Sequence, residues 1–533
     1  SNITNTYIWE RDGYSAVQTF KFEGANTVDA LSSSQCAKHV LTDEDATIKA
    51  PEGSNNVVSG DANYVVAYEG GVYKLVPGSI LNKTQNKKYG TLQAAIDAAV
   101  SGDEIVLLSD IELSDKDIAM SAPLKTMVYV EGKDITLDMN GKAISVKYEG
   151  EPHLIGVVCV ADAAGLTVKG NGSIEVEGVA YDDQFNVAYV FFKRGTTGHL
   201  TIEDGTYHAA DLEDSMVYTN GDDIVTIKGG SFTLDNVGTQ ANGFPCIFNT
   251  QHQNANSIIV NGGTFNSDVN HLFWANEVYV PETLALQNNG DGTWTVVESV
   301  AYVNEIGTST GSKERKVGYA TLAEAVAAGS EVTVVKDAEG AGVVIDKDVT
   351  IDFGGFNYTI NQAVGSTGTE SQGFQLLPAA KNVTIQNGNI SVAEGTNVVW
   401  MFNDYAENLT VKDVTIDCEN MVWSKSVYLI VANNQHSTNP CPVFENVTIS
   451  NYNTERPHAL IENNTQLTAQ AGLNVVTDPG FTVKYVDGTY KVVANMVKVL
   501  DGDTEVGTYA TLSEAISAAT AGNTIQFLAD LTE

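Results

Sequence analysis

Two Gln-His pairs recur at matching places in the sequence and could take part in chemistry. Gln251-His252 precedes Ile258 by the same interval at which Gln435-His436 precedes Pro442. The imidazole groups of His252 and His436 could contact a sugar or a metal ion. They could equally bond an adjacent loop and stabilise a turn, and this structural interpretation is the one we favour.

Acidic and aromatic side chains form a second set of candidates. Asp182 and Asp183 are adjacent, and a pair of carboxylates is what a glycosidase uses as acid and base. Adjacent carboxylates in a turn are more often solvated, so we favour a structural role for this pair as well. Trp274 and Trp423 could stack on sugar rings at a lateral face. These residues keep a glycan-binding surface open as an alternative.

A short segment with the pattern Tyr-x-Thr-Leu-x-x-Ala occurs three times and indicates how the chain is organised. The copies begin at Tyr89, Tyr319 and Tyr509. Each predicts a short amphipathic helix capped by its Thr, because apolar residues follow at helical spacing. A glycine after each helix (Gly102, Gly329 or Gly522) is expected to take a left-handed conformation near the helix end. A β run follows each helix.

A finer repeat, usually apolar-Thr-apolar, follows the first two helices. In the first stretch its units start at Ile135, Leu166, Leu200, Val225 and Ile258, and in the second at Val349, Val383, Leu409 and Pro442. From Leu166 the spacings are 34, 25 and 33 residues, and from Val349 they are 34, 26 and 33. Units of this length cannot bury an apolar face alone and must stack on their neighbours.

The repeats predict a mainly β chain of tandem right-handed parallel β-helix (solenoid) modules, each capped by a short amphipathic α-helix. An array of β-sandwiches is the alternative, but sandwiches turn every ~8–12 residues and have no reason for coils of matched length. The predicted modules are residues 81–298 and 299–495, with the tail of a module in residues 1–80. Residues 496–533 are predicted to be a partial module with a hairpin, a cap helix and a starter strand.

The partial modules at the two ends could complete each other between chains by strand addition. The expected assembly elements lie in the last cap helix and starter strand: Thr511, Leu512, Ile516, Ile525 and Phe527.

Composition limits the classes of partner. The 533 residues include 67 acidic and 29 basic side chains, which gives a formal net charge of -38. Such a chain repels nucleic-acid phosphates and anionic lipids, so neither is expected as a partner. No run of about 18 apolar residues occurs, so no membrane span is expected. Five cysteines without a Cys-x-x-Cys pair favour buried small hydrophobes over a disulfide scaffold or a zinc site.

The pattern from Tyr89 to Leu107, with its Gly-Asp-x-Ile-x-Leu end and the repeats that follow, resembles the pectate-lyase-like parallel β-helix modules of large surface and secreted proteins of anaerobic Gram-positive bacteria. The resemblance implies an extracellular or cell-surface location. It also implies that enzymes of this fold use either calcium with a Lys or Arg base, or paired aspartates.

The chemistry of those enzymes is not matched by motifs in this sequence. The four arginines, Arg11, Arg194, Arg315 and Arg456, are isolated, and neither Asn-Thr-Asp nor Gly-His-Gly occurs. We therefore expect no catalytic residue and no cofactor. Calcium could bind to Asp and Asn side chains, although no known calcium motif supports it.

These observations predict a non-enzymatic extracellular structural or adhesive repeat protein of a bacterial surface. In its sharper form the prediction is a filament subunit that associates head-to-tail, or with neighbouring modules of a longer chain. The alternative is a carbohydrate-binding or carbohydrate-active protein, lyase-like or hydrolase-like, that uses a lateral face around residues 181–194 and His252.

Overall fold

The computed structural model describes most of the chain between residues 8 and 531. The residues in this range that it does not describe are 12–17, 23–26, 30–37, 120–121, 150–153, 178–179, 182–183, 186, 222–223, 240–243, 251–257, 270–277, 307–313, 423–429, 433–441, 453–474, 478 and 487–488. The protein is mainly β, with long parallel sheets stacked in register, consistent with a β-solenoid. It forms two compact units, residues 1–280 with 288–296 and 307–313, and residues 281–287 with 297–306 and 314–533.

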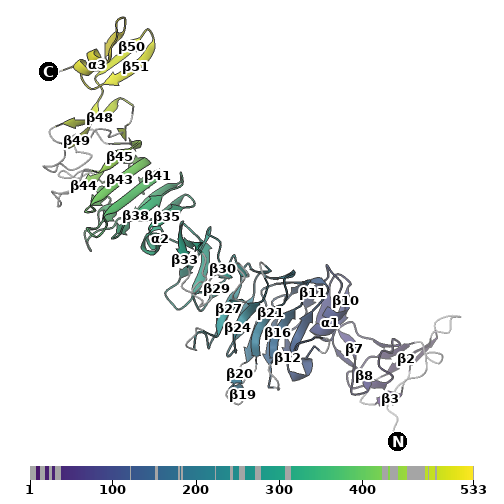
Figure 1. The fold of residues 1–533 in the computed structure, drawn as a ribbon. Coiled ribbons are helices and arrows are strands. Elements are labelled where there is room, and N and C mark those ends of the chain that lie inside the picture. Colours follow the sequence, from purple (N-terminus) through teal and green to yellow (C-terminus); the bar gives the residue numbers. More distant parts are fainter. Residues whose placement is uncertain are drawn as a thin grey trace. The chain divides into compact units, whose positions relative to one another are not determined.

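In the first unit, each coil of the chain adds one strand to each of three parallel sheets (Figure 1). The first sheet contains β13 (Thr126–Val130), β16 (Leu154–Val160), β21 (Val187–Lys193), β24 (Ser215–Thr219) and β27 (Cys246–Thr250). The second contains β14 (Asp134–Asp138), β17 (Ala164–Lys169), β22 (Gly198–Ile202), β25 (Val225–Ile227) and β28 (Ile258–Val260). The third contains β15 (Ala143–Lys147), β18 (Ser173–Glu177), β23 (Thr206–Ala209), β26 (Ser231–Leu234) and β29 (Thr264–Phe265).

The apolar-Thr-apolar repeat sets the register of the second sheet. Leu166 lies opposite Leu200, Leu200 opposite Val225, and Val225 opposite Ile258. The Thr residues between the apolar positions also lie opposite one another and are half-buried, while their apolar neighbours are buried. The alternation expected from a two-residue period is therefore confirmed, and the register of the coils with it.

Aromatic side chains from successive coils stack on one another at the buried face of the third sheet. The Tyr207 and Phe232 rings lie 4.8 Å apart, and the Phe232 and Phe265 rings 5.7 Å apart, both nearly parallel. Each follows a glycine two residues earlier, and Gly263 has a φ of 117°. A Cβ at Gly263 would come within 2.9 Å of the Phe265 ring, so glycine is required there for both backbone and space.

The three expected cap helices are present: α1 (Leu92–Ala98), α2 (Leu322–Ala328) and α3 (Leu512–Ala518). Thr91, Thr321 and Thr511 accept a hydrogen bond from the N3 backbone, and capping boxes form at the second and third helices. The prediction of a left-handed Gly329 is wrong, because its φ is -136°. Glycine is needed there for space instead, since a Cβ would lie 2.8 Å from the Val303 Cβ.

The second unit repeats the in-register parallel arrangement. Val349 in β38 (Val349–Asp352) lies opposite Val383 in β41 (Asn382–Val392), which lies opposite Leu409 in β43 (Asn408–Asp417). A separate parallel sheet contains β37 (Val343–Ile345), β40 (Gln372–Leu376), β42 (Trp400–Asp404) and β44 (Val431–Ala432). The inward side chains of these two sheets of the second unit form one continuous apolar core.

Smaller sheets are formed by the residues near each end. Near the N-terminus, β2 (Gln18–Phe22), β4 (Lys38–Leu41) and β6 (Val57–Ser59) run parallel, as do β3 (Thr27–Asp29) and β5 (Thr47–Lys49). In the second unit, β50 (Val497–Asp501) lies between β51 (Thr504–Tyr509) and β52 (Thr524–Phe527), next to α3.

Cys159, Cys246 and Cys418 are buried and do not form disulfides with one another, as expected of small hydrophobes, while Cys36 and Cys441 lie outside the described residues. Among the described residues, no helix combines the length and the apolar character needed to cross a membrane.

Candidate functional site: an aromatic groove on the first unit

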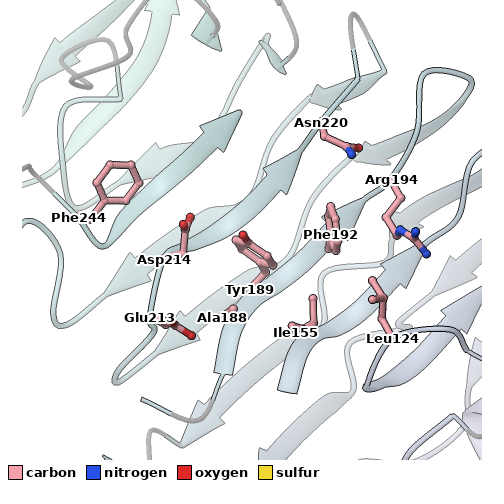
Figure 2. A pocket seen from close by; sticks show the side chains of 10 residues that line it. All are labelled: Leu124, Ile155, Ala188, Tyr189, Phe192, Arg194, Glu213, Asp214, Asn220 and Phe244. Carbon is pink, nitrogen blue, oxygen red and sulfur yellow. The ribbon is translucent and has the colours of Figure 1, made fainter. Parts of the chain in front are cut away.

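A groove with a volume of 730 Å³ lies over the sheet that contains β16, β21 and β24 (Figure 2). Its lining comes from successive coils, because each strand of a parallel sheet places its outward side chains beside those of the next strand. The lining residues are Leu124, Ile155, Ala188, Tyr189, Phe192, Arg194, Glu213, Asp214, Asn220 and Phe244.

Two aromatic rings, Tyr189 and Phe192, line the middle of this groove, and the Tyr218 ring packs against both. The Tyr189 and Tyr218 rings are stacked, with centroids 4.6 Å apart and planes 9° from parallel. Phe192 packs against both, at 5.3 Å from Tyr189 and 5.2 Å from Tyr218. Burial raises the pKa of Tyr189, so its phenol stays neutral and can donate a hydrogen bond. The rings thus form a rigid apolar surface with a polar edge.

Two carboxyl groups lie at one end of the groove (Figure 2). Glu213 is exposed, whereas Asp214 is half-buried and accepts a 2.7 Å hydrogen bond from the Asn249 amide. Burial raises the pKa of Asp214, and its hydrogen bonds to Asn249 and Ser215 oppose the shift. This end therefore offers acceptor oxygens, one of which is held in a fixed position.

The Arg194 side chain lies at the other end, with Tyr189 and Phe192 between it and the carboxyl groups (Figure 2). Its position follows from Lys193, whose buried ammonium group donates to the carbonyl oxygens of Ala161, Arg194 and Thr197 at 2.7–2.8 Å. The same turn is held by Asp162, which accepts from the Thr197 backbone and hydroxyl at 2.9 and 2.8 Å. Burial lowers the pKa of Lys193 to about 8. One lysine thus fixes the turn while the next residue faces the groove.

Asn220 also connects this turn to the next coil. Its Oδ1 accepts a 2.8 Å hydrogen bond from the Gly195 backbone N–H. A Cβ at Gly195, where φ is 76°, would lie 2.3 Å from the Asp162 Cβ, so glycine is required in this turn. The cationic end is consequently preorganised by backbone contacts rather than by the arginine itself.

The glycan-contact candidates predicted from sequence are not placed by the structure. Asp182, Asp183, His252, Trp274, Trp423 and His436 all lie outside the described residues. Arg194 does lie in the lateral region expected for a glycan-binding alternative. Tyr189, Phe192, Tyr218 and Asp214 were not predicted, although Phe192 lies opposite Tyr218 in register, so aromatic residues at matched positions of successive coils were an available signal.

The five predicted assembly residues are brought together in a small subdomain of the second unit. Thr511 caps α3, and Leu512 and Ile525 pack against a cluster of Val497, Val499 and Ala515. Ile516 and Phe527 are exposed. A second hollow of 620 Å³ lies between α3 and β48 (Phe481–Val486), where Lys484 and Glu514 form an ion pair that lowers the pKa of Glu514 against the effect of burial.

In the part of the chain that the structure describes, no group of three or more His, Cys, Asp or Glu side chains is arranged to hold a metal ion. Comparisons of the chain with models of protein families, with curated proteins and with solved structures found no match. Function is therefore inferred from the residues of the two units themselves.

Proposed function

We propose that this chain is an extracellular structural and adhesive repeat protein built from tandem right-handed parallel β-helix modules, and that the groove on its first unit binds a saccharide. The in-register parallel sheets support the β-helix part of the proposal. The observation that carries the adhesive part is the aromatic surface of Tyr189 and Phe192, backed by the Tyr218 ring, between an acidic end and a basic end.

The chemistry of the groove matches that of a sugar. Sugar rings have apolar C–H faces that pack on aromatic rings, and their hydroxyl groups need both donors and acceptors. Asp214 and Glu213 supply acceptors, while Arg194 and the Tyr189 phenol supply donors. The volume of 730 Å³ lies within the ~300–1,000 Å³ that is usual for small-ligand sites.

The extent of the groove favours a saccharide chain over a single sugar. Its lining runs from Ile155 on β16, across β21, to Asp214 just before β24 and Phe244 just before β27. Neighbouring strands are about 4.8 Å apart, so the lining covers several coils. A ligand that lies along the groove would contact the rings and both charged ends at once.

The positions of the carboxyl groups favour binding over hydrolysis. A glycosidase needs two carboxyl groups on opposite sides of the scissile bond, about 5–10 Å apart. Glu213 and Asp214 are adjacent in sequence and lie together at one end of the groove. The opposite end carries Arg194, which cannot act as that second carboxyl group.

The test is a glycan-binding screen of the full chain, followed by titration of the saccharide that binds best. We expect Tyr189→Ala to weaken binding about fivefold, because an aromatic stacking contact contributes roughly 1 kcal/mol. Tyr68→Ala is the matched control, since Tyr68 is an exposed tyrosine outside the groove. Absence of binding to acidic and neutral glycans, or an equal loss in both variants, would refute the adhesive function.

A carbohydrate-active enzyme is the second candidate, and the raised pKa of Asp214 is the observation that favours it. A general acid must hold its proton near the working pH, which burial promotes. Mass spectrometry of the bound saccharide after incubation separates the two functions. Turnover that disappears in Asp214→Asn would establish the enzyme, and an unchanged saccharide would support binding alone.

A further inference from the structure

Helix α3 and strand β52 expose a face that the equivalent elements of both complete repeats bury. Ile96 in α1 and Val326 in α2 are each 2% exposed, but the corresponding Ile516 in α3 is 57% exposed. At the strand that follows each helix, Leu107 and Val334 are 0% and 1% exposed, whereas Phe527 is 54% exposed. Burying large apolar side chains is favourable in water, so a covered state of this face is favoured.

The two complete repeats show what covers that face. In the first, β11 (Glu104–Leu107) pairs in parallel with β14, with Glu104 opposite Thr136 and Ile105 opposite Leu137. In the second, β35 (Glu331–Val334) pairs in parallel with β38 in the same register. In both cases the covering strand contains Thr-apolar-Asp, as Thr136-Leu137-Asp138 and Thr350-Ile351-Asp352.

The same three-residue pattern occurs at an open sheet edge near the N-terminus. Strand β3 has the sequence Thr27-Val28-Asp29, and it is the outermost strand of its sheet among the described residues. It runs parallel to β5, with Thr27 opposite Thr47 and a 2.7 Å contact between their hydroxyl groups. The pairing of β3 with β5 thus matches that of β14 with β17, with Thr opposite Thr in both. Among the described residues, however, no strand pairs with the outer edge of β3 as β11 pairs with β14.

We propose that β52 of one copy adds in parallel to the outer edge of β3 of a second copy. The register is set by the two internal repeats: Thr524 opposite Thr27, Ile525 opposite Val28, and Gln526 opposite Asp29. Main-chain hydrogen bonds along a free edge supply affinity, and the matched side chains supply specificity. Because the two surfaces lie on different parts of the chain, the contact is heterologous and produces linear head-to-tail oligomers unless the rotation closes a ring.

One difference from the internal repeats affects the neighbouring helix. In the first repeat α1 packs directly against β13. At the N-terminal end the outer edge of β2, which corresponds to β13, is already paired with β1 (Ile8–Arg11). In the proposed contact α3 therefore cannot take the place that α1 takes beside β13, and strand addition at β52 carries the register.

Sedimentation velocity of the full chain over a wide concentration range tests the contact. We expect species larger than a dimer to grow with concentration, and Phe527→Asp to raise the concentration needed at least tenfold. Val344→Asp is the matched control, because Val344 is 45% exposed on β37, away from this face. A chain that stays monomeric throughout, or a control that acts like Phe527→Asp, would overturn the proposal.

Cysteine cross-linking tests the register without altering the apolar face. A copy with Gln526→Cys mixed with a copy with Asp29→Cys should form a disulfide-linked pair, since both positions are exposed and opposed residues are within disulfide range. Lys49→Cys is the control partner, because Lys49 is exposed on β5, one strand further from the edge. Equal cross-linking to Lys49→Cys, or none to Asp29→Cys, would refute the assigned register.

Discussion

The buried carboxyl group of Asp404 predicts how the stability of the second unit depends on pH. It ends β42 with 2% of its surface exposed, and its Oδ1 accepts a 3.0 Å hydrogen bond from the Ala406 backbone N–H. Burial raises the pKa of Asp404 from 3.8 to about 7, more than this hydrogen bond lowers it. The folded state therefore holds a proton that the unfolded chain releases near pH 4.

The sign and size of the effect follow from linkage. Between the two pKa values the folded chain binds more protons than the unfolded chain, so the stability of the second unit falls as pH rises. A shift of about three pKa units corresponds to roughly 4 kcal/mol, most of it lost between pH 4 and 7. Asp404→Asn keeps the acceptor oxygen for Ala406 but cannot ionise. It should therefore gain up to that amount over the wild-type chain by pH 8.

The assay is urea unfolding of both chains at several pH values, with the difference in unfolding free energy plotted against pH. Asp348→Asn is a control of opposite sign, because hydrogen bonds from the Asn382 and Lys381 backbone lower the pKa of the exposed Asp348. The wild-type chain should be more stable than Asp348→Asn above pH 4, and this difference in unfolding free energy should disappear as pH falls. A flat difference for Asp404→Asn between pH 4 and 8 would show that this carboxyl group is not held protonated.

Two further predictions concern the first unit. Lys193→Met should destabilise it by about 1–3 kcal/mol, because three buried or partly buried carbonyl oxygens lose their donor. The substitution should also speed amide hydrogen exchange in residues 194–198 while residues 225–227 keep their rate. Exchange that stays slow in the turn would contradict the role assigned to Lys193. Phe232→Ala should lower the unfolding free energy by about 3–5 kcal/mol, since its buried ring packs against Tyr207, Phe248 and Phe265. A loss below about 1 kcal/mol in urea unfolding would show that the stack is not part of a close-packed core.

The sequence predicts the coil register and the cap helices because both depend on local, periodic signals. Thr321 with Glu324 identifies a helix start, and the Thr at the centre of each apolar triplet fixes which side chains point inward. Gly329 shows the limit of that reasoning. Its identity is set by the approach of Val303, more than twenty residues away along the chain, which no local pattern contains.

The groove could not be predicted from alternation, because β21 departs from it. Phe191 lies inside, edge-on to the Tyr207 ring at 5.4 Å, while Tyr189 and Phe192 both line the groove. Outward positions three residues apart violate the two-residue period, which would place Tyr189 inside with Phe191. The sequence shows an apolar run from Val187 to Phe192, and only the packed structure separates its inward rings from its outward rings.

The two proposed activities draw on opposite properties of a repeat. Inward positions must match from coil to coil. The outer edge of β52, with Thr524 and Ile525, can therefore accept a strand with the Thr-apolar-Asp sequence, because such strands already pair with the equivalent β11 and β35. Outward positions are free to vary, and Arg194 has no counterpart near Leu377 in the second unit. Assembly therefore depends on what the repeats share, whereas saccharide binding depends on where one coil differs. Substitutions at Phe527 should leave the groove intact, and substitutions at Tyr189 should leave assembly intact.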